Sequence, residues 1–429
     1  MENQILELQY ALDTFYFLVM GALVMWMAAG FTMLESGLVR AKNTTEILTK
    51  NVALYAVSCV MYLLMGYTIM YGGSDGGILP DSWFGNSIAN ATAEEVLAGA
   101  AADASDYTYY SGASDFFFQV VFVATAMSIV SGAVAERMKL WSFLAFAVVM
   151  TGVIYPLQGM WKWGGGFLDA AGFLDFAGSG VVHMTGAAAA LAAVILLGAR
   201  KGKYRADGSV NAIPGANMPM AALGMFILWV GWFGFNAGSA LAADGNAGMA
   251  MLVTHLSAAA GCLTWSFIEW IRYGKPSALG AVTGMVAGLG TITPASGYVG
   301  PAGAMVIGLS AGIVCFYCTL WLKQVFKIDD SLDVFPVHGV GGILGTFMAG
   351  IFASSELGVF SGQGLAEGMT ILSQLKVQLI GIGATFAYTA VVSLILFYVI
   401  DKLIGLRVTA DEEAQGLDIT CHNEVGYDL

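Results

Sequence analysis

Long apolar runs recur along the whole chain, and each contains 20 or more residues. In a helix that rises about 1.5 Å per residue, a run of this length crosses the roughly 30 Å hydrocarbon core of a bilayer. Helices are expected, because an open sheet would leave backbone groups unpaired in lipid and the alternating pattern of an outer-membrane barrel is absent. With 58% hydrophobic and 11% charged residues among 429, the chain has more apolar surface than one soluble core buries. The sequence therefore predicts an all-α integral membrane protein.

Hydropathy along the chain predicts eleven membrane-spanning helices. An odd number of spans places the two termini on opposite sides of the membrane. We expect the spans at residues 13–35, 48–71, 115–135, 140–160, 175–199, 218–238, 247–271, 277–297, 299–322, 334–354 and 372–401.

The distribution of Lys and Arg tests this count, because cytoplasmic loops are enriched in basic residues and a missed span would disturb the alternation. With the N-terminus outside, 15 of the 17 basic residues fall in cytoplasmic segments, and only Lys162 and Lys376 fall outside. The acidic segment 72–114 has no basic residue, so we expect an extracytoplasmic loop there. The sequence thus predicts an outer N-terminus and an inner C-terminus.

The chain is expected to divide into a membrane domain, residues 1–404, and a polar cytoplasmic tail, residues 405–429. Near its start it carries Glu2 and Glu7 but no Lys or Arg before the first apolar run. A signal peptide has a basic segment at this place, so we expect no cleaved signal peptide and a first run that is retained as a span.

Composition disfavours several classes of function. A formal charge of -13 argues against a nucleic-acid partner. The five cysteines show no framework of spacings, and Cys315 and Cys318, one turn apart in a predicted span, fit packed thiols better than a metal or redox pair. No nucleophile and base, and no metal-ligand cluster, stand out, so we expect neither an enzyme nor a metal or cofactor site.

Histidines inside the apolar runs are the first candidates for function, because ionisable groups are costly in a bilayer. Of the four histidines, His422 lies in the polar tail and His255 begins a span of ordinary appearance. If Asp175 begins its helix at the outer side, His183 lies about 12 Å along that helix, near the middle of the membrane. His338 lies in a span of opposite direction. A lone buried histidine is more often a core residue than a functional one, so the argument rests on the pair.

The two histidine-bearing spans are equivalent if the first ten spans form two repeats of five. Because five is odd, the second copy must be inverted in the membrane, and the eleventh span is then an added C-terminal helix. His183 and His338 are 155 positions apart, as such a duplication requires, and we expect the two side chains to meet.

Six stretches add a more specific signal: LDFAGSGVVH, GWFGFNAGSA, WGGGFLDAAGFLDFAGS, VSGAVAER, DVFPVHGVGGILG and GLRVTADEEAQGLDITCHNEVGY. Together and in this arrangement they resemble the ammonium transporter (Amt/Mep/Rh) family, on its bacterial and archaeal Amt side. The resemblance covers nearly the whole chain. It implies a multi-pass protein of the plasma (inner) membrane of a prokaryote.

The resemblance implies an outer recruitment site for ammonium and a gate below it. Trp163 and Ser239 resemble the residues that hold the ion by cation-π contact and by a hydroxyl acceptor, with Phe122 beside them. Phe122 and Phe235 resemble the stacked rings that close the pore. Taken singly, Trp163 could be an interfacial aromatic, Ser239 could bond back to its own helix, and the two Phe could be core residues.

The resemblance also assigns roles to the intramembrane polar residues. Asp175 resembles a buried carboxylate close to the recruitment site that is needed for conduction, although it could also simply cap a helix. His183 and His338 resemble the twin histidines that line an otherwise apolar channel.

Elementary electrostatics agrees with this picture. A bare cation in a dry apolar pore would face a cost of tens of kcal/mol, whereas cation-π contact returns only about 0.5 to 2 kcal/mol per ring. We therefore expect NH4+ to be captured at the mouth and to lose its proton near the Phe gate, so that NH3 crosses. The imidazole pair then either carries the proton separately or supplies polar contacts.

Partners are implied by the resemblance as well: a homotrimer with one pore per subunit, and a PII signalling protein at the cytoplasmic face. The tail resembles an ordered regulatory region in which His422-Asn423-Glu424 stands where relatives usually show His-Gly-Glu. Asn tolerates a left-handed backbone, so the turn can survive. Two rival functions stay open: an ammonium sensor that signals through the tail, and an unrelated ion-coupled solute carrier, against which the scarcity of Pro argues.

Overall fold

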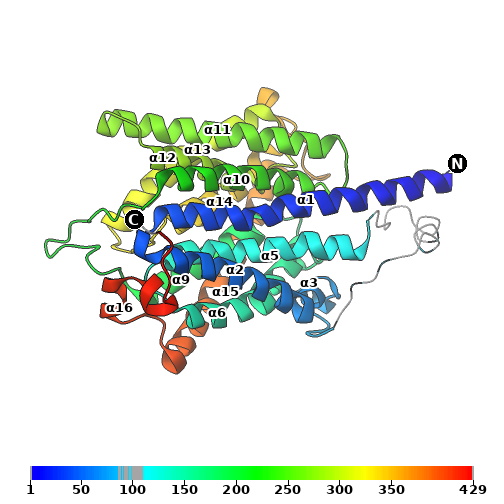
Figure 1. Ribbon diagram of the computed structural model, residues 1–429. Helices are drawn as coiled ribbons and strands as arrows, with labels where there is room; N and C mark the ends of the chain where they lie inside the picture. The colour runs from blue at the N-terminus through cyan, green and yellow to red at the C-terminus, as the bar shows by residue number, and fades with distance from the viewer. Residues whose placement is uncertain are drawn as a thin grey trace.

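The computed structural model describes residues 2–85, 88, 90, 95, 98 and 110–427. Figure 1 shows long helices lying side by side in a bundle, and the described residues form helices joined by turns and loops, with only isolated β-bridges. The α-helices are α1 (Glu2–Leu38), α2 (Thr44–Met61), α3 (Tyr67–Tyr71), α5 (Gly112–Val134), α6 (Leu140–Val149), α7 (Tyr155–Lys162), α8 (Phe167–Ala170), α9 (Thr185–Leu197), α10 (Met218–Gly238), α11 (Gly245–Tyr273), α12 (Ala278–Ile292), α13 (Pro301–Gln324), α14 (Gly341–Phe352), α15 (Ile371–Ile404) and α16 (Ala410–Gln415).

Short helical segments of other types occur within the spans, in the loops and in the tail. Five of these are π-helical, with an extra residue in the turn: η2 (Tyr62–Gly66), η4 (Met150–Ile154), η5 (Ser179–Met184), η6 (Phe335–Val340) and η8 (Asp418–His422). Three are 3-10 turns: η1 (Ala41–Asn43), η3 (Asp75–Gly77) and η7 (Gly358–Phe360). π-turns interrupt the regular hydrogen-bond pattern of a helix and are rare, and they are frequently found at functional sites.

In the part of the chain that the structure describes, ten helical segments are long and apolar enough to cross a membrane. The remaining predicted span, residues 277–297, contains α12, which has only 15 residues. At about 1.5 Å per residue α12 is about 22 Å long, shorter than a typical hydrocarbon core. Gly284 and Gly288 bring α12 so close to α11 that a side chain at either position would meet α11. The first helix also differs from the expectation, because it begins at Glu2 rather than near residue 13.

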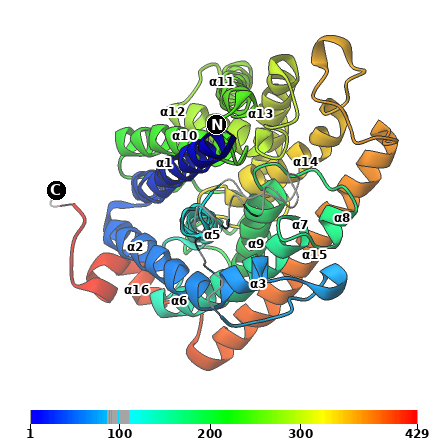
Figure 2. The same cartoon turned by 90° about the vertical axis from the view of Figure 1, so that its right-hand side faces the viewer.

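Helices α5 and α9 form the centre of the bundle, and Figure 2 shows them surrounded by the others. In the most apolar stretches of α5 and of the continuous segment η5–α9, 94% and 83% of the residues are buried, against 33% in α1 and 22% in α15. A helix that is apolar on all sides but has an exposed outer face fits contact with lipid. Function is therefore to be sought along α5 and α9, away from the lipid.

Residues 405–427 pack against one end of the bundle, which we call the tail end; the opposite end is called the aromatic end. Asp418 accepts a hydrogen bond from the backbone N–H of Glu46, and Nε2 of His422 lies 2.6 Å from Oε2 of Glu46. Asn423 ends η8 in the left-handed conformation, with φ 54° and ψ 35°, as expected from its residue type. The tail is ordered because its polar side chains find partners on the bundle.

A buried charge network holds the loops at the tail end. Arg200 pairs with Glu136 at 2.9 Å and with both carboxylate oxygens of Asp329 at 2.9 Å. Burial by itself would raise the pKa of Glu136, but Arg200 and Arg40 outweigh that effect and hold the pKa at about 2. The same balance, with Arg200 as the dominant partner, lowers the pKa of Asp329. These carboxylates are charged at neutral pH, so the loops are fixed by ion pairs rather than by apolar packing.

Candidate functional site

A cavity of about 410 Å³ opens at the aromatic end. Its walls come from α5, from the turn after α7 and from the end of α10, so residues far apart in sequence meet there. Aromatic and acidic groups dominate the lining, which includes Tyr67, Asp115, Phe122, Trp163, Asp169 and Ser239. Lys162 also lines the cavity and pairs with Asp169, so the carboxylate of Asp115 and the π faces of the aromatic rings are left to favour cations over anions.

Trp163 and Ser239 both line this cavity, as predicted for the recruitment site. Nε1 of Trp163 donates to the carbonyl oxygen of Asp175 at 3.3 Å, which holds the indole in place. The hydroxyl of Ser239 donates its proton to the carbonyl of Phe235, in its own helix, at 2.8 Å. This is the hydrogen bond that the alternative interpretation of Ser239 predicted. A hydroxyl oxygen that has donated its own proton can still accept from a ligand, and Ser239 therefore faces the cavity as an acceptor.

Phe122 lines the cavity, and Phe235 stacks on it from the side of His183. Their ring centroids are 4.1 Å apart with an angle of 30° between the planes, and Phe122 meets Trp163 edge-on at 6.0 Å. Both Phe side chains are fully buried. The structure thus brings the predicted pair of rings together, directly between the cavity and the histidines.

Asp175 does not begin its helix, contrary to the expectation from the sequence. The helical segment starts four residues later at η5, and the carboxylate accepts hydrogen bonds from the backbone N–H groups of Gly178, Ser179, Gly180 and Val181 at 3.2, 2.7, 2.8 and 3.0 Å. The chain must turn back toward the carboxylate to do this, and Gly178, with φ 103°, supplies the left-handed residue. Asp175 therefore caps the segment that carries His183.

His183 and His338 meet, as the repeat argument predicted. Their Nδ1 atoms are 3.2 Å apart and the rings are stacked with centroids 5.2 Å apart. Each lies in a six-residue π-turn, η5 or η6, that leads into a regular helix. At most one of the two Nδ1 atoms carries the shared proton, and Nε2 of His183 has no hydrogen-bond partner among the described residues.

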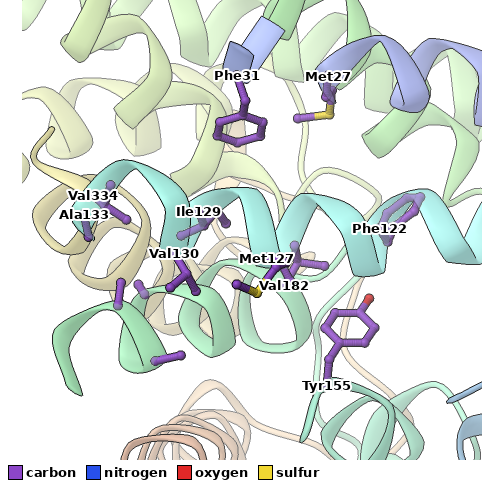
Figure 3. Packing of buried hydrophobic residues seen from close by; sticks show 14 of the residues in the cluster. Met27, Phe31, Phe122, Met127, Ile129, Val130, Ala133, Tyr155, Val182 and Val334 are labelled. Atoms are coloured by element: carbon purple, nitrogen blue, oxygen red, sulfur yellow. The ribbon is translucent and has the colours of Figure 1, made fainter. Parts of the chain in front are cut away.

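The surroundings of the histidine pair are apolar. Figure 3 shows Phe122, Met127, Ile129 and Val130 along α5, together with Val182 of η5. These side chains are almost fully buried. A passage between them offers a cation no replacement for its hydration shell, whereas a small neutral molecule pays little to enter.

Trp232 is part of the site, although it was not singled out in the sequence. Its ring lies 5.2 Å from His183 and 6.5 Å from His338, nearly parallel to the latter at 5°. Its Nε1 donates to the hydroxyl of Thr293 at 2.8 Å, which fixes the indole plane. The signal was present in the stretch GWFGFNAGSA, in which Trp232 precedes Phe235 by one turn and so shares its helix face.

A second, smaller cavity begins at His338 and extends toward the tail end. Its volume is about 50 Å³, several times the roughly 10–15 Å³ that one water needs on the same measure. Phe31, Glu35, Ser128 and Gly132 are among its lining residues. The larger cavity, the two Phe rings, the histidine pair and the smaller cavity thus follow one another along the bundle.

Comparison with known proteins places this arrangement in context. A sequence model described as the Ammonium Transporter Family matches residues 15–427. Among curated proteins, the chain is 41% identical to "Ammonium transporter Amt2" of Archaeoglobus fulgidus, over 97% of this chain and 88% of the relative. It is 36% identical to an ammonium transporter of Bacillus subtilis, over 97% of this chain and 98% of that protein.

Solved structures show the same fold. A structure titled "Sensor Amt Protein" superposes with a TM-score of 0.88 at 33% identity, and the match covers 98% of this chain and 100% of that chain. The Mep2 structure from Candida albicans superposes with a TM-score of 0.81 at 28% identity, covering 94% and 87% of the two chains. The likeness thus extends over the whole membrane bundle.

Proposed function

The chain belongs to the ammonium transporter family, and from that premise we propose that it recruits NH4+ at the outer cavity, deprotonates it and conducts NH3 past the histidine pair. The observation that carries this proposal is the order of the elements along the route. A cation-attracting cavity is followed by the stacked rings of Phe122 and Phe235 and then by His183 and His338 in apolar surroundings.

Recruitment rests on Trp163 and Ser239 at the cavity wall. The indole face attracts a small cation, and the hydroxyl oxygen accepts an N–H bond from ammonium. K+ has nearly the same size but no proton to donate, so the hydroxyl distinguishes the two ions chemically rather than by size. Asp169 in the same cavity is paired with Lys162, so Asp115 is the carboxylate whose negative charge is left to attract cations.

Passage requires loss of the charge. Cation-π contact returns about 0.5 to 2 kcal/mol per ring, far less than the tens of kcal/mol needed to desolvate an ion in a dry pore. The proton therefore leaves near the Phe pair, and ammonia enters. The free Nε2 of His183 and the shared proton between the two Nδ1 atoms offer ammonia an acceptor or a donor, or a path for the proton.

A proteoliposome experiment tests the proposal. Purified protein is expected to give ammonium-evoked current or uptake, a smaller response to methylammonium and none to K+. The pair His183→Ala with His338→Ala is expected to lose the flux or the selectivity. His255→Ala is the matched control, because His255 stacks on Trp229 and lies away from the pair. Unchanged flux and selectivity in the double variant would contradict the mechanism.

Sensing is the second candidate function. Two observations favour it: the likeness to the "Sensor Amt Protein" and the ordered tail that packs on the bundle. If the chain is a sensor, we expect it to bind ammonium without measurable flux. The same vesicle experiment separates the two, because binding without uptake or current would favour the sensor.

We further infer a homotrimer, one pore per subunit, in the inner membrane of a prokaryote with the tail end in the cytoplasm. The basic side chains of Lys42, Lys139, Arg200 and Arg407 gather at the tail end, as expected for a cytoplasmic face. A PII signalling protein is the regulator expected at this face. Cross-linking and mass measurement in native membranes, with and without PII, test both assignments.

A further inference from the structure

A buried carboxylate lies on the route but has no part in the mechanism described above. Glu35, near the end of α1, is 2% exposed. Its Oε2 accepts from the hydroxyl of Ser131 at 2.7 Å and from Nδ2 of Asn51 at 3.1 Å. Its Oε1 has no hydrogen-bond partner among the described residues, which is costly for a carboxylate shielded from bulk water.

Glu35 lines the smaller cavity, which begins at His338. On α1 it follows Phe31 by four residues, so the two share one helix face about 6 Å apart along the axis. The ring of Phe31 lies 6.3 Å from the ring of His338. The carboxylate is therefore about one helix turn beyond the histidine pair, on its tail-end side, where the cavity has room for a few waters or one small ion.

No basic side chain neutralises this carboxylate directly. Glu35 takes part in none of the ion pairs formed within the described ranges. The charge of Lys50 acts on Glu35 and partly offsets it, but its Nζ forms no ion pair with the carboxylate: it donates to the carbonyl of Ser131 at 3.1 Å and lies over the ring of Phe143. Ser131 and Asn51 fix the carboxylate in place, and its free oxygen remains for a cation.

We propose that Glu35 forms an inner ammonium site, at which ammonia that has passed His338 regains a proton and is held before release. This inference rests on the proposed function. In the cavity the lone pair of NH3 takes a proton from a hydronium ion, so that a fourth N–H bond forms, an O–H bond breaks and water remains. The NH4+ product then donates to Oε1 of Glu35 and to cavity water. The carboxylate makes this end of the pore favourable for the charged product, as Trp163 and Ser239 do at the other end.

A side-resolved transport assay tests this site with ammonium as the probe. Vesicles of the two orientations are separated by an affinity tag at the C-terminus, and half-saturation is measured with ammonium added at either side. Glu35→Gln keeps the shape but removes the charge. It is expected to raise the half-saturation for ammonium at the tail end about tenfold and to leave the value at the aromatic end unchanged. Glu269→Gln, the same change outside the cavity at the same end, is the control and should alter neither value.

A second variant keeps the carboxylate and blocks its free oxygen. A Cβ added at Gly132 would lie 3.5 Å from Oε1 of Glu35 and 3.0 Å from Cγ2 of Val334, so Gly132→Ala places a methyl group in the cavity against the carboxylate. It is expected to raise the same half-saturation, and it decides the question if Glu35→Gln does not fold. Wild-type flux with no side-specific change in either folded variant, or an equal change at both sides, would overturn the inner site. No flux in the wild type would instead overturn the proposed function.

Discussion

Replacing Asp175 by alanine removes the acceptor that orders the start of the histidine-bearing segment. The carboxylate is fully buried and accepts four backbone hydrogen bonds, two on each oxygen. A carboxylate has about four acceptor positions, so all are occupied and none is left for a substrate. Asp175 therefore acts by positioning: it holds Gly178 in its left-handed turn and, through its own carbonyl, the indole of Trp163.

The magnitude follows from the number of bonds. A net contribution of about 1 kcal/mol for each hydrogen bond gives about 4 kcal/mol for the four lost in Asp175→Ala, and the lost carboxylate at the positive end of the helix adds up to about 1 kcal/mol. Asp175→Asn retains one acceptor oxygen and is expected to cost about half as much. Asp244 caps α11 with a single hydrogen bond to Ala247 at an exposed position, so Asp244→Ala should cost only about 1 kcal/mol.

Thermal melting of the purified protein, followed by vesicle transport of the same samples, measures both consequences. We expect the melting temperature to decrease least in Asp244→Ala, more in Asp175→Asn and most in Asp175→Ala. Transport is expected to decrease in the two Asp175 variants and to stay unchanged in Asp244→Ala. If Asp175→Ala melted like the wild type and conducted ammonium normally, the positioning role would be wrong.

Three further predictions concern the mouth and the tail end. Trp163→Leu removes a cation-π contact of about 0.5 to 2 kcal/mol and should raise the half-saturation for outer ammonium roughly 2- to 30-fold, measured by uptake. Arg200→Ala leaves the buried carboxylate of Asp329 without its ion-pair partner, while Glu136 keeps Arg40, and should cost about 3–5 kcal/mol in denaturant or thermal unfolding, whereas an exposed lysine changed to alanine should cost little. Glu46 raises the pKa of His422, so the ion pair stabilises tail docking fully below a pH of about 6.5, and the stabilisation is lost as pH rises through the higher folded pKa. Protection of residues 418–427 from hydrogen exchange, taken relative to the intrinsic exchange rate at each pH, should fall over that range; constant protection, or the same fall in His422→Gln, would refute it.

Much of the fold was predictable because lipid restricts the possible structures. Apolar length identified spans wherever a helix had to satisfy its own backbone groups, and the predicted spans coincide with helices throughout the described ranges. The exception in length is α12, which has 15 residues and packs closely on α11 at Gly284 and Gly288. Such packing is a property of two helices together and is not visible in either run alone.

The sequence by itself determined which residues were rare and costly enough to matter: His183, His338 and Asp175 stood out because an apolar run has no other reason to keep them. Only the tertiary structure decided three points. The carboxylate of Asp175 caps the helical segment that follows it, both histidines lie in π-turns, and Glu35 lines the cavity on the tail-end side of His338. The physical reason is that the free-energy cost of placing a side chain in lipid depends on its residue type, whereas its hydrogen-bond partners depend on which atoms the fold brings near it. The oxygens of Asp175 are satisfied by N–H groups three to six residues later, once the chain turns at Gly178, whereas the hydrogen-bond partners of Glu35 lie 16 and 96 residues away.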